Sequence, residues 1–390
     1  MDTLSPPLVP FHCPYRASAE VKYVLDALSS GHTEGDGPYT RRAAELLSRL
    51  VGGGTVLLTT SCTHALDMTA LLLRLKPGDE VIVPSFTFVS TASAYALRGA
   101  TPVFVDCRLD TLGIDERAVE AAVTERTRAI VVVHYGGVAG DLDALGKLAE
   151  RHGLALIEDN AHGLGGAYRD RPLGGIGSMS TLSFHATKNI QCGEGGALVL
   201  NDPELVEAAE IVREKGTDRS RFFRGQVDKY RWMELGSSYL PSDTLAAVLT
   251  AQLEEFDQIQ ARRSRVWDGY HSGLADWARA NGVSQPIVPA DSRHTAHVYP
   301  LLMPDLATRR DLISHLAGRG IRASFHYQPL HASPAGLRHG RVGPGGCPVT
   351  EEVADRLVRL PLYADLTADD TELVIDAVRA FQPRPATALR

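Results

Sequence analysis

The sequence predicts an α/β fold, in which a large domain with a mostly parallel, seven-stranded sheet between two layers of helices is followed by a smaller α+β domain. Three observations lead to this prediction. Between residues 55 and 200, short apolar runs rich in β-branched residues alternate with helical patterns, which is typical of a parallel sheet flanked by helices. A long helical pattern then interrupts the alternation. The length of 390 residues suits one large and one smaller domain.

Each predicted strand is a short apolar run bounded by turn-forming residues. The seven runs are 55–60, 80–84, 102–106, 129–135, 154–158, 179–184 and 195–200. The helices expected between or just after these runs are 65–75, 141–151 and 203–215. The last of them has Pro203 near its start and basic residues near its end, as helices prefer. We expect Gly174, Gly175 and Gly177 in a turn between strands.

The pattern from 243 to about 274 has apolar residues at helical spacing, so we expect one long helix that leads out of the large domain. The smaller unit is predicted to contain two strands, 296–303 and 321–327, and two helices, 308–317 and 366–381. Thr367 and Asp370 have the spacing of a capping box at the start of the last helix. We therefore expect a large domain over residues 1–255 and a small one over residues 256–390.

Composition limits the partners of the chain. It has 40 Lys and Arg against 47 Asp and Glu, for a net charge of -7, whereas nucleic acids and anionic membranes require a basic surface. There is no apolar run of about 20 residues and no signal-peptide pattern at the start. We expect a cytoplasmic protein that binds neither nucleic acid nor membrane. The five cysteines are scattered without a C-x-x-C pair, which predicts neither a disulfide framework nor a metal site.

Three stretches place polar residues directly after predicted strands, where ligands bind in open α/β sheets. In residues 156–162 an apolar run ends in Glu158 and Asp159. In residues 182–188 a run ends in hydroxyl residues and Lys188. Residues 59–65 form a hydroxyl-rich turn that opens a helix. Because the strands are expected to be neighbours, we expect these three stretches to meet.

One of these stretches could bind a phosphate. The start of a helix offers unpaired N–H groups and the positive end of a dipole. Thr63 and His64 could therefore hold a phosphate through their backbone amides, with the hydroxyl of Ser61 or Thr63 as a further donor. Ser183 could add another from the facing strand. The ordinary alternative for this turn is a helix N-cap without a ligand.

The other two stretches supply an acid and an amine. A buried carboxylate such as Asp159 would keep a pyridine nitrogen protonated and make the ring an electron sink. Lys188 could form an imine with an aldehyde and then move protons, provided that burial lowers its pKa. Taken singly, Asp159 could be a turn former and Lys188 a solvated side chain. Together with the phosphate turn, they fit pyridoxal 5′-phosphate (PLP).

A nucleotide cofactor is the rival explanation for a phosphate site. No G-x-x-x-x-G-K-[ST] stretch is present, and the glycines near 163–166 and 174–177 do not form G-x-G-x-x-G after a first strand. These absences argue against a P-loop enzyme and a dinucleotide dehydrogenase.

At these residues the chain resembles the sugar aminotransferases of the DegT/DnrJ/EryC1/StrS family. The similar stretches run from about Phe11 to the C-terminal helix and include SCTHAL (61–66), PSFTFVST (84–91), EDNAH (158–162) and SFHATK (183–188). Within the family, the chain is most similar to enzymes that make dTDP-4-amino-4,6-dideoxyhexoses. REKGTDRS (213–220) and FRGQVDKY (223–230) resemble the dTDP-4-amino-4,6-dideoxygalactose transaminases closely.

The resemblance implies a type I aminotransferase fold and a homodimer with both active sites at the subunit interface. It implies that Lys188 is the Schiff-base lysine, that Asp159 pairs with the ring nitrogen and that Phe88 covers one face of the ring. The phosphate-binding positions of the family match Thr63, His64 and Ser183. The family's dehydratases have histidine at the position of Lys188, so the resemblance implies a transaminase.

Two positions depart from the pattern of many family members. His162 stands where many have Gln, and it could contact the ring hydroxyl or stack on the ring. Ser238 stands where many have an Asn that reaches the phosphate in the partner subunit, so the shorter side chain puts that contact in doubt.

Two groups of residues are candidates for the substrate. The basic segment 213–231 could meet the diphosphate of a sugar nucleotide on an otherwise acidic protein, or it could be a solvated loop or dimer seam. Its candidate residues are Arg219, Arg224 and Lys229. An aromatic and histidine-rich stretch near the predicted strand 321–327 could line the sugar site or merely finish the strand. Its candidates are His326, Tyr327 and His331.

The function expected from this resemblance is transfer of an amino group from L-glutamate to C4 of dTDP-4-keto-6-deoxy-D-glucose. The product would be a dTDP-4-amino-4,6-dideoxyhexose, with galacto and gluco configurations both open. Two alternatives are amination of another nucleotide-linked keto sugar, such as a C3-keto hexose, and a PLP-binding regulator or inactive scaffold.

Overall fold

An eight-stranded sheet is the centre of the larger part of the chain. The computed structural model describes residues 8–383. The strands, in their order across the sheet, are β1 (Thr55–Thr59), β9 (Gly196–Leu200), β8 (Met179–Ser183), β5 (Ala155–Asp159), β4 (Thr127–Val133), β2 (Glu80–Pro84), β3 (Thr101–Val105) and β12 (Arg341–Val342). Strand β9 is antiparallel to both of its neighbours, and the other adjacent pairs are parallel.

The seven strands predicted from the sequence are all present in this sheet. The eighth, β12, comes from the C-terminal part of the chain and pairs with β3. Two residues are too few to show a period, which is why sequence patterning missed this strand.

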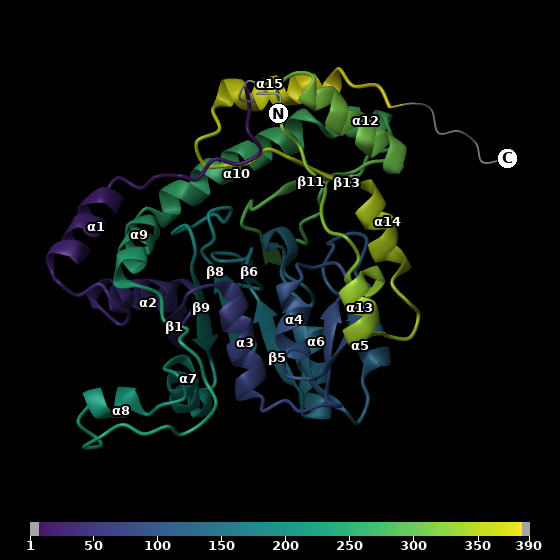
Figure 1. Cartoon of the computed structure of the whole chain (residues 1–390). Helices are drawn as coiled ribbons and strands as arrows, with labels where there is room; N and C mark the ends of the chain where they lie inside the picture. Colours follow the sequence, from purple (N-terminus) through teal and green to yellow (C-terminus); the bar gives the residue numbers. More distant parts are fainter. Residues whose placement is uncertain (1–7, 384–390) are drawn as a thin grey trace.

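Helices cover both faces of the sheet, as expected (Figure 1). One face carries α3 (Cys62–Leu72), α4 (Ser90–Ala96) and α7 (Val206–Arg213). The other carries α2 (Pro38–Leu50), α5 (Glu116–Ala122), α6 (Leu142–His152) and α9 (Asp243–Glu254). Alternation along the strands explains the two layers, since successive side chains point to opposite faces. In β2, Val81 and Val83 pack in the core beneath α3, whereas Ile82 packs in the core beneath α5 and α6.

The long helix expected over 243–274 is two helices. Helix α9 ends at Glu254 and α10 (Phe256–Gly273) begins two residues later, because Glu255 lies outside helical geometry (φ -99°, ψ 15°). Its carboxylate accepts hydrogen bonds from Ser18 and Tyr15 of the N-terminal segment. The helix expected over 203–215 likewise has two parts, a 3-10 turn (Pro203–Leu205) followed by α7.

A two-stranded antiparallel sheet, β11 (Tyr299–Leu302) with β13 (Leu357–Leu360), lies in the C-terminal part. It packs against α10, α12 (Leu306–Ala317) and α15 (Ala368–Arg379). The predicted cap is present, because Thr367 accepts a hydrogen bond from the Asp370 amide at 3.0 Å. Other helices of this part are α11 (Ala275–Ala280), α13 (Pro334–His339) and α14 (Pro348–Arg356).

The strand predicted over 321–327 is wrong. Only isolated bridges form there, Val9 with Ile321 and Ser324 with Arg359. The segment meets a different neighbour at each of these two points, so no ladder develops.

The N-terminal segment crosses to the C-terminal part (Figure 1). Val9 is buried in the core formed by α10, α12 and α15, and α1 (Glu20–Ser29) packs against α9. The division into domains at residue 255 stays a prediction. The remaining short elements are β6 (Ala167–Tyr168), β7 (Arg171–Pro172), β10 (Ser292–Arg293), α8 (Arg219–Phe223) and 3-10 turns at Tyr135–Gly137 and Leu330–Ala332. Within residues 8–383, none of the helices has the length and apolar character needed to cross a bilayer.

Candidate active site

A cavity of about 670 Å³ opens at the carboxyl ends of the parallel strands. Its walls come from the turn after β1, the loop after β2, the end of β5 and the loop after β8. The C-terminal part closes it with residues 324–327 and the end of β13, and the N-terminal segment adds Phe11 and His12. The three polar stretches singled out in the sequence therefore meet in one place.

Asp159 is the last residue of β5 and is almost completely buried. Its Oδ2 accepts a 2.7 Å hydrogen bond from Thr91 Oγ1, and its Oδ1 accepts a longer one, 3.3 Å, from the Ala161 amide. Burial raises the pKa of Asp159, although these two donors and the amine of Lys188 oppose the shift. A cationic partner in the cavity would offset the cost of ionising this carboxylate.

Lys188 lies in the loop after β8 and lines the same cavity. Burial lowers the pKa of its amine from 10.5 to about 8, while the nearby Asp159 carboxylate limits the shift. Part of the amine is therefore deprotonated at pH 7, and only the deprotonated form is a nucleophile.

The start of α3 forms another wall. Ser61 is its N-cap and accepts a 3.1 Å hydrogen bond from the His64 amide. Thr63 Oγ1 lies 2.7 Å from Ser90 Oγ, and Ser183 lines the cavity nearby. Gly196 lets this turn approach β9, because a Cβ at residue 196 would lie 2.3 Å from the Cys62 nitrogen. Hydroxyls and the first amides of a helix are thus gathered at one end of the cavity.

Aromatic rings form a further wall. His162 stacks on His297 with ring centroids 4.1 Å apart, and His326 stacks on Tyr327 at 3.5 Å. Burial lowers the pKa of both His162 and His326, so these rings are neutral at physiological pH. Phe88 lines the cavity from the loop after β2 and is 57% exposed.

Comparisons with known proteins agree with this geometry. A family model described as the DegT/DnrJ/EryC1/StrS aminotransferase family matches residues 14–379. The chain belongs to this family. It is a PLP-dependent sugar aminotransferase with the type I aminotransferase fold, as the resemblance implied.

Relatives cover nearly the whole chain. The spore coat polysaccharide biosynthesis protein SpsC of Bacillus subtilis is 34% identical over 378 residues, which are 95% of this chain and 96% of SpsC. The aminotransferase TlmJ of Streptoalloteichus hindustanus is 32% identical, with a TM-score of 0.87 over 96% of this chain and 98% of TlmJ. The sugar aminotransferase Spr1654 of Streptococcus pneumoniae, solved in its PLP form, is 27% identical, with a TM-score of 0.87 over 95% of this chain and 97% of Spr1654.

The side chains in the cavity fit PLP. Asp159 is a buried acid that lacks a cationic partner of its own in the wall, other than the Lys188 amine, and a pyridinium nitrogen would supply one. Lys188 supplies the amine. The hydroxyls of Thr63, Ser90 and Ser183 and the start of α3 supply donors for a phosphate.

Several predicted site residues do not line the cavity of their own chain. The His64 ring contacts Thr60 and Tyr239 instead, and its amide is taken by Ser61. His331 bridges Ser85 and Glu351.

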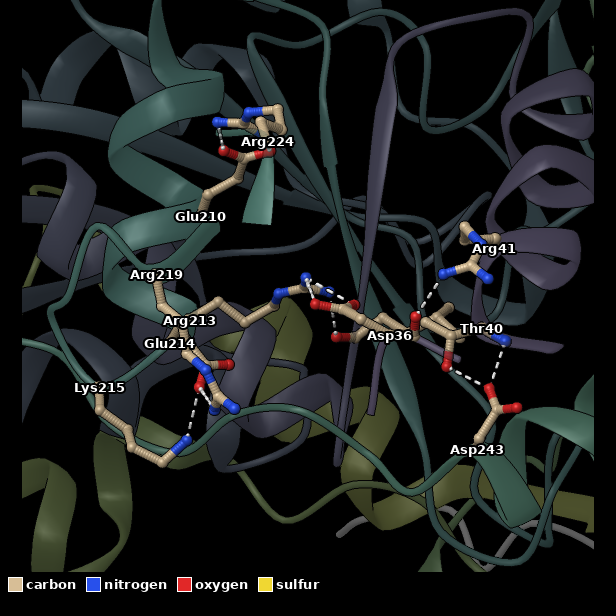
Figure 2. A network of polar contacts seen from close by, with 11 residues as sticks. Asp36, Thr40, Arg41, Glu210, Arg213, Glu214, Lys215, Arg219, Arg224 and Asp243 are labelled. Atoms are coloured by element: carbon tan, nitrogen blue, oxygen red, sulfur yellow. Dashed lines mark hydrogen bonds and ion pairs between the residues drawn. The ribbon is translucent and has the colours of Figure 1, made fainter. Parts of the chain in front are cut away.

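The basic segment also lies away from the cavity. Residues 214–238, which we call the arm, extend beyond α7 and contain α8 (Figure 1). Arg219 donates to Glu214 at 3.0 Å, and Arg224 is paired with Glu210 at 2.9 and 2.8 Å (Figure 2). Lys229 and Ser238 are exposed.

The arm is anchored at its base by Arg213. This buried guanidinium donates to both carboxylate oxygens of Asp36 at 2.8 and 2.7 Å (Figure 2). At the same base, the carboxylate of Asp243 accepts a 2.7 Å hydrogen bond from the Thr40 amide at the start of α2. The arm therefore projects from a fixed base, and none of its residues lines the cavity of its own chain.

Sequence reasoning missed several cavity residues, among them Thr91, His297 and Arg359. Thr91 lies within the stretch 84–91 that carries the family resemblance, but its bond to Asp159 depends on packing between α4 and β5. His297 reaches the cavity because the nearby Thr295 donates a hydrogen bond to the His162 carbonyl, a contact between residues distant in the sequence. Arg359 interrupts the apolar run of residues 357–362, and a charge inside an apolar strand was the one signal available for it.

Proposed function

We propose that this enzyme transfers the amino group of L-glutamate to C4 of dTDP-4-keto-6-deoxy-D-glucose and produces a dTDP-4-amino-4,6-dideoxyhexose. The observation that carries the reaction type is the convergence of Lys188 and Asp159 on one cavity, with the pKa of the Lys188 amine lowered to about 8. The choice of sugar is supported by residues 213–230, which resemble the C4 transaminases of dTDP sugars.

The bound cofactor supplies an aldehyde carbon and an aromatic ring that accepts electrons. Asp159 would pair with the ring nitrogen and keep its proton in place, which favours a cationic ring. Lys188 Nζ removes the proton from the α-carbon of glutamate in the first half of the cycle. In the second half, it delivers a proton to C4 of the sugar. The face of the sugar that meets Lys188 therefore sets the configuration of the new amine.

Hydroxyl and aromatic groups orient these reactants. Thr63 and Ser183, with the first amides of α3, would hold the phosphate, and Phe88 and His162 line the cavity where they would meet the ring of the cofactor. His326 and Tyr327 lie on the wall formed by the C-terminal part, and the Tyr135 hydroxyl is 3.1 Å from His326 Nδ1. We assign these two residues to the sugar subsite.

We further propose that two chains share each active site. Support comes from the exposed aromatic side chains of the arm, Phe223 (70% exposed), Tyr230 and Trp232 (76% exposed), since contiguous exposed apolar surface marks an interface. In such a homodimer, Arg219, Arg224, Lys229 and Ser238 reach the phosphate or nucleotide in the partner's cavity. A cytoplasmic location remains a prediction.

The test is an assay of the holoenzyme with L-glutamate and dTDP-4-keto-6-deoxy-D-glucose, followed by proton NMR of the product. An amine at C4 and one equivalent of 2-oxoglutarate are expected. Lys188→Ala should abolish turnover, and Lys147→Ala, at an exposed lysine on α6, is the matched control. If the enzyme aminates only a C3-keto sugar, the assignment of the substrate is wrong.

Subunit sharing is tested by mixing two inactive variants. Lys188→Ala and Arg219→Ala should each lose activity, and refolding them together should restore part of it, because a mixed dimer has one intact site. A sample that runs as a monomer in analytical ultracentrifugation, or a mixture that stays inactive, would contradict a shared site.

A further inference from the structure

Arg359 is a cavity residue to which the reaction described above gives no role. It lies in β13, where its amide and carbonyl are hydrogen-bonded to Ser324. Its Nη2 donates to the Phe325 carbonyl at 2.9 Å, and its guanidinium lies 4.8 Å from the centre of the Phe11 ring. Two independent contacts therefore hold the guanidinium in one position at the cavity wall.

No carboxylate pairs with Arg359 anywhere in residues 8–383. Its Nε is buried and has no hydrogen-bond partner there. Arg213 is more deeply buried than Arg359, and its Nε also has no hydrogen-bond partner, but its guanidinium is paired with both oxygens of Asp36. Removing a cation from water without a counter-ion costs free energy. The partly buried guanidinium of Arg359 therefore has the features of an anion-binding group.

Its charge acts on the groups that carry out the chemistry. After burial, the charge of Arg359 is among the causes that lower the pKa of Lys188, His162 and His326. The guanidinium therefore faces the same space as the reacting amine.

We propose that Arg359 binds the α-carboxylate of the amino donor. This inference rests on the proposed function and names the donor subsite of that reaction. A guanidinium with free N–H groups matches a carboxylate, with which it forms paired hydrogen bonds of fixed orientation.

The chemistry of the two substrates favours the carboxylate over a diphosphate. In glutamate, the α-carboxylate is attached to the carbon that loses its proton to Lys188. In a pyranose aminated at C4, the diphosphate is attached to C1, across the ring from the reacting carbon. An anion receptor that shares the cavity with the reacting amine and acts on its charge is thus placed for the amino acid, whereas the diphosphate is attached on the far side of the sugar ring.

The experiment is a calorimetric titration of the holoenzyme with glutarate and, separately, with dTDP. Glutarate presents the carboxylates of the donor without an amine, so no turnover is needed. Arg359→Gln should weaken glutarate binding at least tenfold and leave dTDP binding unchanged. Arg359→Lys keeps the positive charge but lacks the planar guanidinium. Its affinity for glutarate should lie between those of Arg359→Gln and the wild type. Arg322→Gln, which removes an exposed positive charge from the same part of the chain, should match the wild type for both ligands.

Loss of dTDP affinity with unchanged glutarate affinity would overturn the proposal in favour of a phosphate subsite. If Arg359→Gln binds each ligand as tightly as the wild type does, the proposal is also overturned, and the role of Arg359 is structural. Neither result depends on which keto sugar the enzyme accepts. A failure of the C4 assignment therefore appears in the turnover assay alone.

Discussion

Thr91 Oγ1 donates a 2.7 Å hydrogen bond to Asp159 Oδ2 in the buried wall of the cavity. Thr91 lies on α4 and is fully buried, and its hydroxyl is also 2.9 Å from Thr87 Oγ1. The carboxylate that faces the cofactor site is therefore oriented by a chain of hydroxyl groups from a neighbouring element. Such a bond favours the ionised form of the acid.

Thr91→Val should lower kcat by about 10- to 100-fold, because a hydrogen bond to a charged group contributes about 1.5–3 kcal/mol. Loss of this donor also raises the pKa of Asp159 further. The acid limb of the pH–rate profile should therefore move to higher pH. Thr91→Ser keeps the hydroxyl and should restore both kcat and the profile. A Val variant with an unshifted acid limb would remove Thr91 from the positioning of Asp159.

Asp159→Asn should lower turnover by about 10²-fold or more, the loss typical of a preorganised electrostatic group. The cofactor-free variant should nevertheless be more stable than the wild type at neutral pH. Because burial raises the folded-state pKa of Asp159 above 3.8, the wild type loses stability as pH rises from 3.8 through the folded pKa. The variant has no such loss.

Thermal unfolding from pH 4 to pH 8, with and without PLP, measures this difference. The stability advantage of Asp159→Asn should grow with pH in the cofactor-free protein and shrink or reverse when PLP is bound. If PLP stabilises the variant as much as the wild type, Asp159 does not pair with the ring.

The amine of Lys188 should react with acylating reagents at a much lower pH than an ordinary lysine. Its pKa of about 8, lowered from 10.5 by burial, means that the neutral form increases as pH rises through 8. Mass spectrometry of the cofactor-free enzyme labelled with limiting acetic anhydride gives the midpoint for this residue. Asp159→Asn removes a charge that favours the protonated amine, so the midpoint should move lower still. A midpoint near 10.5 in the wild type would contradict an enclosed amine.

Asp36→Asn should destabilise the base of the arm by about 1–2 kcal/mol, because buried Arg213 keeps a hydrogen-bond acceptor but loses its counter-charge. Asparagine is the suitable replacement, since residue 36 has a positive φ of 62°, which Asn tolerates. Thermal unfolding and limited proteolysis within residues 214–238 report the effect. Asp276→Asn breaks an exposed pair with Arg279 and should change neither measurement. Equal effects of the two substitutions would show that the Arg213 pair does not anchor the arm.

Much of the fold follows from local patterning. The seven predicted strands are buried on both faces and stand out as apolar runs, whereas the helices that cover them bury one face and show a helical period. The failures have particular causes. The break at Glu255 interrupts a continuous helical pattern at a residue whose carboxylate accepts hydrogen bonds from Tyr15 and Ser18, and a local pattern contains no sign of these distant partners. Strand β12 and the irregular segment 321–327 depend on which neighbours the chain meets, and a local pattern does not contain that information.

The convergence of Asp159 and Lys188 was predictable for a topological reason, since carboxyl ends of neighbouring parallel strands share one edge of a sheet. Thr91, His297 and Arg359 reach the cavity from other elements, and no spacing in the chain predicts their contacts. The sequence also did not predict that Arg219 and Arg224 pair with Glu214 and Glu210, away from the cavity of their own chain.

The sequence by itself determined the layers of the fold and the chemical types gathered at its strand ends, because both depend on periods and positions along the chain. Only the tertiary structure decided which side chains share the cavity, how burial moves the pKa values of Lys188 and Asp159, and which arginine stands there without a counter-ion. Burial and charge pairing depend on distances between residues remote in sequence, and these distances exist only once the chain has folded.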